Sequence, residues 1–511
     1  MKAQHIRTAA HYYPQKPALI MADSGKTLNY RELSSRANRC AQLLFSLGLR
    51  AGDRFALLME NRSEFIEICW AGINSGLLFT PISTHLKADE VAFIVDDCDA
   101  KVIFFSHQTE GILDVLDSHC PQLMAAINVS CKAQYEDALV LHNDRPLEQE
   151  SRGAPMVYSS GTTGRPKGIV PQADDASPME PTRLSQLLAR LYDFNEETVY
   201  LSPAPLYHTA PLKFNLTVTA MGGTTVICER FHEEAALAYI ERYRITHSQW
   251  VPTMFKRFLM LPEAMRKRYD YSSQRFVIHA AAPCPPAVKR AMIDWWGPIL
   301  YEYYAGSESV GLCAISPEEF EHYPGSVGRA VKGSIHILDE HGKELPMDQT
   351  GTIYFEGGGN FAYHKDSQKT RSAYNANGWS TFGDLGYLDA DGYLYLSDRR
   401  EDLIISGGVN IYPQEIENLL IEHPLVADAA VFGVSNEEYG EEVKACVQLI
   451  NPAQAGPNTE EILLNYCRAR LSHIKCPGNI DFLDTLPRYA NGKLHKRELK
   501  TRFEQPMTDS R

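Results

Sequence analysis

The sequence lacks the features that mark secreted, membrane-spanning and nucleic-acid-binding proteins. None of its 511 residues lies in an uncharged apolar run of about 18, the length needed to cross a bilayer, and residues 1–17 contain no signal-peptide core. The 11 cysteines are scattered singly, without a C-x-x-C pair or zinc-binding spacing, which favours reduced thiols in the cytoplasm. A net charge of −14 argues against nucleic acid or an anionic membrane as the main partner.

Helix-like and strand-like segments alternate through most of the chain. Apolar residues recur at helical spacing over residues 30–47 and again over residues 63–76. Short apolar runs that predict strands lie at residues 55–59, 101–105, 224–228, 248–251 and 275–281. Strands that alternate with helices favour an α/β fold, with largely parallel β-sheets layered by helices.

The texture of the chain changes near Gly378. The turn signals Asn377-Gly378 and Asp391-Gly392 bracket short strands. Beyond Asp398 the pattern predicts two helices and two strands, at residues 413–420, 427–434, 442–449 and 460–471. We therefore expect a large N-terminal domain at residues 1–397 and a small α+β C-terminal domain at residues 398–511.

The most informative segment is the loop at residues 159–168, which reads SSGTTGRPKG. Glycines let the backbone N–H groups approach an anion closely, and hydroxyls and a lysine add further donors, so the loop suits a phosphate chain. It is not the common nucleotide loop, because Pro166 stands five positions after Gly161 and Lys167 is followed by Gly168. The candidate phosphate ligands are Ser159, Ser160, Gly161, Thr162, Thr163, Gly164 and Lys167.

A second motif presents one carboxylate after a strand, in Tyr304-Ala305-Gly306-Ser307-Glu308. Beside a polyphosphate, a lone carboxylate suits Mg²⁺, which prefers oxygen ligands. The alternative from the residues alone is a helix whose N-cap is Ser307.

These motifs, with others in the same order along most of the chain, resemble the acyl-adenylate-forming superfamily. This superfamily contains acyl- and aryl-CoA synthetases, peptide-synthetase adenylation domains and beetle luciferases. Its Tyr-Gly-x-Thr-Glu motif is matched with Ala305 for Gly and Ser307 for Thr, and its Thr-Gly-Asp motif with Phe382 before Gly383. The resemblance implies a nucleotide site in which Asp384 and Arg399 hold the ribose and Tyr304 lies against adenine. Its other members are Ala281, Ala282, Pro283, Tyr303, Ala305, Gly306 and Ser307, with Glu308 and Thr162 at Mg²⁺.

The resemblance also implies an acyl pocket and a path for a thiol. The segment Leu206-Tyr207-His208-Thr209-Ala210-Pro211 is similar to the pocket motif, with His208 facing the reacting carboxyl group. The implied pocket residues are His208, Thr209, Ala280 and Ala305. After Lys167-Gly168 the family commonly has a Thr/Ser-His pair. Here the sequence is Ile169-Val170-Pro171-Gln172, so the resemblance does not imply which residues form that wall of the pocket.

The C-terminal motifs of the resemblance imply a mobile small domain. Asp398 is the implied hinge, and Ser406, Gly407 and Gly408 border the implied CoA channel. Lys493, after the Asn491-Gly492 turn, is the implied catalytic lysine, although a lysine at a loop tip is most often only solvated.

The implied activity is ATP-dependent activation of a carboxylic acid to acyl-AMP, followed by transfer to coenzyme A. The motifs resemble those of bacterial fatty-acid-type ligases, including relatives that act on bulky steroid side-chain or aryl acids. Two alternatives stay open: another acceptor (a carrier protein, an amine or oxidative chemistry) and a non-catalytic nucleotide-binding homologue. We expect no separate carrier domain after Leu499, and the sequence leaves a homodimer open.

Overall fold

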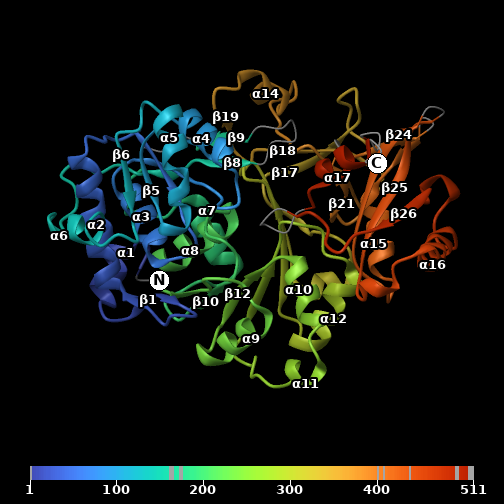
Figure 1. Cartoon of the computed structure of the whole chain (residues 1–511), viewed down its shortest axis with the longest axis horizontal. Coiled ribbons are helices and arrows are strands. Elements are labelled where there is room, and N and C mark those ends of the chain that lie inside the picture. Colours follow the sequence, from blue (N-terminus) through green and yellow to red (C-terminus); the bar gives the residue numbers. More distant parts are fainter. Residues whose placement is uncertain are drawn as a thin grey trace, which may run out of the picture. The chain divides into compact units, whose positions relative to one another are not determined.

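The computed structural model describes residues 3–159, 166–171, 176–399, 402–406, 409–436, 439–488 and 494–504. It divides into two compact units (Figure 1). Unit 1 comprises residues 1–250, 260–278 and 360–371, and unit 2 comprises residues 251–259, 279–359 and 372–511. This division follows packing and does not test the predicted boundary after residue 397, which stays a prediction.

Unit 1 contains a parallel sheet in the order β6-β5-β3-β4-β7. Ala56 and Leu58 of β3 face helices α4 and α5, in a cluster with Val91 and Leu116. On the opposite face α3 approaches so closely that a Cβ on Gly72 would lie 2.8 Å from the Phe79 ring. Because side chains alternate along a strand, both faces of this sheet are buried under helices.

A second sheet of unit 1 contains β12, β10, β11 and β1 as parallel neighbours, with β2 antiparallel at its edge. A third, small antiparallel sheet has the order β19-β9-β8. The strands of unit 1 are β1 Pro17–Met21, β2 Thr27–Asn29, β3 Arg54–Leu58, β4 Leu78–Pro81, β5 Ala100–Phe105, β6 Ala125–Asn128, β7 Ala154–Pro155, β8 Val157–Ser159, β9 Lys167–Val170, β10 Val199–Ser202, β11 Thr224–Ile227, β12 His247–Trp250, β13 Phe276–His279 and β19 Ala362–Tyr363. Its helices are α1 Ile6–Tyr12, α2 Tyr30–Ser46, α3 Ser63–Asn74, α4 Ala88–Asp97, α5 Leu113–His119, α6 Glu136–Val140, α7 Arg183–Leu191, α8 Thr209–Ala220, α9 Glu233–Arg242, α11 Glu263–Arg266 and α14 Ser367–Ser372.

Unit 2 contains the antiparallel strands β16-β15-β14, a four-stranded antiparallel sheet β17-β18-β20-β21, and the sheet β23-β22-β25-β24 with β26 paired to β25. Its strands are β14 Leu300–Ala305, β15 Leu312–Ile315, β16 Arg329–Lys332, β17 Ser334–Leu338, β18 Gly351–Glu356, β20 Asp384–Leu388, β21 Leu394–Arg399, β22 Ile404–Ser406, β23 Val409–Ile411, β24 Val426–Asn436, β25 Gly440–Leu449 and β26 Asn479–Phe482. Its helices are α10 Pro252–Leu259, α12 Pro286–Trp296, α13 Pro317–His322, α15 Pro413–Ile421, α16 Pro457–Arg468 and α17 Lys496–Glu504.

In the C-terminal sheet β25 is the central strand, and it pairs along its length with the edge strand β24. Ala429 and Val431 pack with Ile416 of α15 and Leu463 of α16 in one core cluster. Residues of the opposite face, among them Phe432, pack with Leu499 of α17 in another. The mixed α/β architecture predicted from the alternating pattern is confirmed, with helix-layered sheets and a sheet-and-helix C-terminal part.

Candidate functional site

The glycine-rich loop leaves β8 and returns on β9. These strands pair antiparallel, with Tyr158 opposite Gly168 and Ser159 opposite Lys167. The predicted phosphate ligands Ser160, Gly161, Thr162, Thr163 and Gly164 lie outside the described residues. The two predicted ligands at the ends of the loop, Ser159 and Lys167, are therefore opposite each other in the strand register at its base.

Side chains from distant parts of the chain hold the base of this loop. The Tyr158 hydroxyl donates to Oδ2 of Asp97 at 2.6 Å, and Nε2 of His364 donates to the Asp97 backbone oxygen at 2.8 Å. The backbone N–H of His364 donates to the Gly168 carbonyl at 2.8 Å. Gly168 has no room for a side chain, because a Cβ there would lie 2.7 Å from Met156 and 2.8 Å from the Tyr158 ring.

Sequence reasoning missed Asp97, Tyr158 and His364 as residues that support the loop. Tyr158, directly before it, could have been noticed. Asp97 and His364 carry no local signal, because they join the loop only through the tertiary fold. Burial, together with the Asp97 carboxylate, raises the pKa of Tyr158, so the phenol keeps the proton that it donates.

His208 occupies the N-cap position of α8, and Thr209 begins the helix. Both residues are half-buried, and the His208 ring packs edge-on against Tyr207 with 4.7 Å between centroids. The turn before them is fixed by buried Asn61, which accepts from Leu206 N at 2.7 Å and donates to the Ala204 and Cys228 carbonyls. Asn61 therefore positions the segment that carries His208, a role that its place after β3 did not suggest.

The predicted adenine-side turn begins at His279, the last residue of β13 and the point at which the chain passes from unit 1 to unit 2. The strand therefore ends two residues before the predicted end at residue 281. Ala280 is buried, whereas Ala281 and Pro283 are exposed and Ala282 is half-buried. Ala281 has φ of 76°, a left-handed conformation that few non-glycine residues adopt. Backbone strain of this kind concentrates at functional sites, where the surrounding structure enforces it.

Tyr303 and Tyr304 are neighbours on β14 and point to opposite faces of it. Tyr303 is buried, and Tyr304 is half-exposed. The Tyr304 hydroxyl donates to Oδ2 of Asp384 at 2.5 Å, which joins the predicted adenine residue to the predicted ribose residue. The Tyr304 ring also meets the Phe382 ring edge-on, with 5.7 Å between centroids.

Ala305 ends β14, and the chain then turns through Gly306, Ser307 and Glu308 toward β15. The alternative in which Ser307 caps a helix is wrong, because Ser309 takes a left-handed φ of 57° and the chain continues as a strand. Gly306 lies under Phe382, and a Cβ there would come within 2.4 Å of that ring. Phe382, the departure from the family pattern, therefore packs on the turn that presents half-buried Glu308.

Asp384 and Arg399 are direct partners in the antiparallel pair β20–β21, and Leu385 is opposite Asp398. This register brings together the backbones of the two residues predicted at the ribose. The turn before Asp384 is held by Thr381, whose hydroxyl accepts from Gly383 N at 2.9 Å. Gly383 has φ of 85°, which a glycine adopts without strain.

The predicted hinge residue Asp398 is bonded to a helix of the C-terminal part. Its Oδ2 accepts from the backbone N–H of Gln414, in the first turn of α15, at 2.9 Å. A carboxylate at this place satisfies a free helix N–H and is favoured by the helix dipole. Of the predicted CoA-channel residues, Ser406 ends β22 and is buried, whereas Gly407, Gly408 and the predicted catalytic Lys493 lie outside the described residues.

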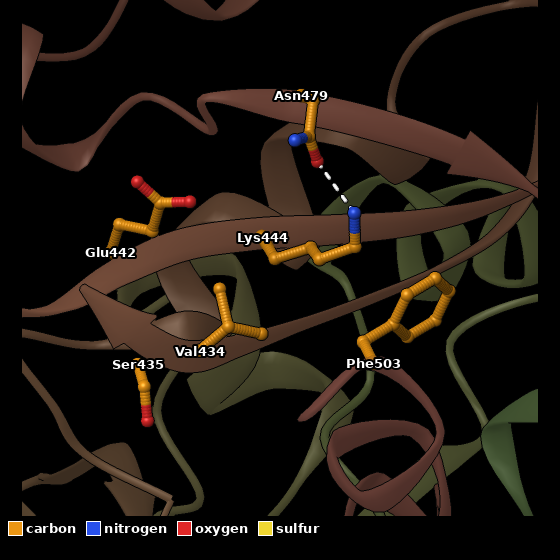
Figure 2. A pocket seen from close by; sticks show the side chains of 6 residues that line it. All are labelled: Val434, Ser435, Glu442, Lys444, Asn479 and Phe503. Carbon is orange, nitrogen blue, oxygen red and sulfur yellow. Dashed lines mark hydrogen bonds between the residues drawn. The ribbon is translucent and has the colours of Figure 1, made fainter. Parts of the chain in front are cut away.

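A pocket of about 310 Å³ lies on the C-terminal sheet (Figure 2). It is lined by Val434, Ser435, Glu442, Lys444, Asn479 and Phe503, none of which is a predicted site residue. Nζ of Lys444 donates to Oδ1 of Asn479 at 2.7 Å, forms an ion pair with Asp481 and lies 4.6 Å from the centre of the Phe503 ring. The lysine is therefore paired within the sheet.

Comparison with known proteins shows the family. Residues 6–363 match the family described as AMP-binding enzyme, and residues 415–493 match the AMP-binding enzyme C-terminal domain. The chain belongs to the AMP-binding enzyme family. The predicted membership of the acyl-adenylate-forming superfamily is thereby confirmed.

Named relatives agree over nearly the whole chain. A long-chain-fatty-acid–CoA ligase of Mycobacterium tuberculosis is 29% identical over 98% of this chain and 97% of its own. A fatty acid–[acyl-carrier-protein] ligase of Streptomyces coeruleorubidus is 29% identical over 97% of this chain and 95% of its own. The crystal structure of ATP-bound MatB from Rhodopseudomonas palustris superposes with a TM-score of 0.86, at 26% identity over 98% of this chain and 99% of that one.

These relatives confirm the enzyme class predicted from the motifs, an AMP-forming acid–thiol ligase. They differ in acid and in acceptor, so neither follows from membership of the family. In the described part of the chain no helix is long and apolar enough to span a membrane.

Proposed function

We propose that this enzyme activates a carboxylic acid with ATP to give an acyl-adenylate and pyrophosphate, and then transfers the acyl group to the thiol of coenzyme A. The observation that carries the proposal is the cluster in unit 2. Tyr304 is bonded to Asp384, Asp384 is in register with Arg399, and the turn bearing Glu308 begins at Gly306 beneath Phe382. Tyr304 is suited to a flat base, and Asp384 with Arg399 is suited to the two hydroxyls of a ribose, so together they suit adenosine.

The chemistry follows from charge. A carboxylate is a poor electrophile, and its attack on the α-phosphate brings two anions together, so cations are needed. Lys493 is proposed to bridge the carboxylate and the α-phosphate, while Lys167 and the hydroxyls of Ser159, Ser160, Thr162 and Thr163 steady the leaving phosphates. The thiol then attacks the mixed anhydride carbonyl, and AMP leaves with the electron pair of the broken C–O bond.

The donor set fits Mg²⁺. In the described residues no group of three or more His, Cys, Asp or Glu side chains is placed to hold a metal alone, and the Glu308 turn offers one hard carboxylate. Mg²⁺ is commonly held by one or two carboxylates together with substrate phosphates. We propose Glu308 and Thr162 as its protein ligands; when bound, the ion neutralises phosphate charge.

The acid is proposed to be a fatty or bulky carboxylic acid, in keeping with the mycobacterial relative, a long-chain-fatty-acid–CoA ligase. His208 and Thr209 at the start of α8, with Ala280 and Ala305, are the proposed pocket residues. We propose that the C-terminal domain rotates about Asp398 between the two steps. The rotation would remove Lys493 from the reacting groups after the first step and admit the thiol for the second.

A pyrophosphate-release assay with a panel of acids tests the first step, and product analysis with several acceptors tests the second. With the right acid we expect ATP-dependent pyrophosphate release and an acyl-CoA product only when coenzyme A is present. Acyl transfer to a phosphopantetheinylated carrier protein or to an amine, with coenzyme A inert, would replace the proposed acceptor. Failure to release pyrophosphate with every acid would leave a nucleotide-binding protein without the proposed activity.

A further inference from the structure

A buried ion pair joins α12 to β14, close in sequence to the predicted nucleotide residues of unit 2. Nζ of Lys289, on α12, donates to Oε2 of Glu302, on β14, at 2.8 Å. The Lys289 side chain is fully buried, and Glu302 is nearly so. Sequence reasoning assigned neither residue a role.

The two partners lie close in sequence to the adenine-side turn and to Tyr304, respectively. Lys289 lies in the first turns of α12, six residues after Pro283, and Glu302 is two residues before Tyr304. Their bond therefore fixes the separation between the helix that closes the adenine-side turn and the strand that carries Tyr304. Because side chains alternate along a strand, Glu302 projects to the same face of β14 as Tyr304, and it is buried there against Lys289 of α12.

The rings of His279 and Phe320 lie beside the pair. His279 is fully buried, and burial holds its pKa well below the ordinary value, so its ring is neutral. Neither ring nitrogen of His279 has a hydrogen-bond partner among the described residues, and its Nε2 is 3.6 Å from Oε2 of Glu302. Lys289 also lies 4.2 Å from the centre of the buried Phe320 ring. Neither ring could replace either charge.

A buried ion pair is a poor source of stability, because desolvation of both charges offsets their attraction and apolar residues of similar volume often serve as well. A hydrogen-bonded ion pair fixes the distance and the orientation of its two partners, whereas an apolar contact does not. We infer that Lys289 and Glu302 are positioning residues for the nucleotide, holding the adenine-side turn and Tyr304 at the spacing that the base requires. This inference rests on the proposed function, because it presupposes that unit 2 binds ATP.

The decisive variant removes both charges at once, Lys289→Met with Glu302→Leu, which leaves no unpaired buried ion. We expect it to melt near the wild-type temperature and to bind ATP about tenfold more weakly by calorimetry, with the KM for the acid within about twofold of wild type. Glu302→Gln, which keeps an oxygen within reach of Lys289, is expected to bind ATP with an intermediate Kd. It serves as the second test if the double variant does not fold.

The control is Arg36→Met with Glu67→Leu, which removes an ion pair between partly buried Arg36 of α2 and fully buried Glu67 of α3 in unit 1. Because Arg36 also pairs with Glu136 and Glu67 also accepts from the Tyr135 hydroxyl, this variant is expected to melt at a lower temperature, and it should bind ATP as wild type does. Wild-type ATP affinity in folded Lys289 and Glu302 variants would overturn the inference and make the pair simple core packing. Because binding is measured without acid or thiol, a wild-type protein that binds no ATP would instead overturn the proposed function, and this inference with it.

Discussion

The hydroxyl of Tyr304 donates to the carboxylate of Asp384 across 80 residues of sequence, at 2.5 Å. One motif is predicted to face adenine and the other the ribose, so this bond couples the two halves of a nucleoside site before any ligand arrives. Preorganisation of this kind reduces the ordering that binding requires.

Tyr304→Phe tests that coupling. The ring, and its packing on Phe382, remain, while Asp384 loses a donor. Because hydrogen bonds to charged groups contribute about 1.5–3 kcal/mol, we expect the Kd for ATP to rise by roughly tenfold or more. The melting temperature should change little. Unchanged ATP affinity, measured by calorimetry, would mean that the bond does not help to bind the nucleotide.

Gly306→Ala should damage the same site by crowding. The added methyl would come within 2.4 Å of the Phe382 ring and force the turn bearing Glu308 to move. Overpacking of this kind typically costs about 1–3 kcal/mol, so we expect adenylate formation to fall by tenfold or more. Adding Phe382→Leu should restore part of the activity by making room. If the second change brings no recovery, the steric explanation is wrong.

Glu308→Gln replaces a carboxylate ligand by a neutral amide. We expect the fold to survive and the Mg²⁺ concentration for half-maximal adenylate formation to rise by about tenfold. Titration of Mg²⁺ at fixed ATP measures this. Glu318→Gln, on α13, is the control and should titrate as wild type does. Wild-type activity of the Glu308 variant at low Mg²⁺ would remove this residue from the metal site.

Lys493→Ala separates the two half-reactions. If this lysine bridges the carboxylate and the α-phosphate, adenylate formation should fall by about a thousandfold, while acyl transfer from supplied acyl-AMP should remain within a few-fold. Rapid-quench assays of each step with radiolabelled substrates measure the split. Lys496→Met is an unsuitable control, because Lys496 pairs with buried Glu417 at 2.9 Å; exposed Lys343→Ala serves instead. Equal losses in both steps would contradict the assignment.

Acid should destabilise unit 1 through His247. Burial lowers the pKa of this residue from 6.5 to about 4, although its Nε2 is bonded to the Tyr192 carbonyl at 2.8 Å. The native ring stays neutral while the unfolded ring takes up a proton, so its stability contribution is complete above pH 6.5 and is lost as the pH falls toward 4. Between pH 7 and pH 5 this amounts to about 2 kcal/mol.

The comparison of wild type with His247→Gln isolates that term from the carboxylates, which titrate in both proteins. The wild-type melting temperature should fall further between pH 7 and pH 5 than that of the variant. Parallel shifts in the two proteins would show that His247 is not responsible for the acid sensitivity.

The sequence by itself determined the family and several of the elements. The helix predicted at residues 30–47 is α2, Tyr30–Ser46, and the strand at residues 224–228 is β11, Thr224–Ile227. The helix predicted at residues 460–471 begins earlier, because Pro457 opens α16 at a position where a missing N–H costs nothing. Periodicity, turn residues and motif order are local properties, and they can be read along the chain.

Only the tertiary structure decided which side chains meet. The Tyr304–Asp384 bond and the support of the glycine-rich loop by Asp97 join residues far apart in sequence, and the Lys289–Glu302 pair joins a helix to a strand. The turn at Ser307, where a helix was an equal alternative, was decided by the left-handed backbone at Ser309 and by packing of Gly306 under Phe382. Such contacts depend on how sheets and helices close on one another, and no local pattern encodes that.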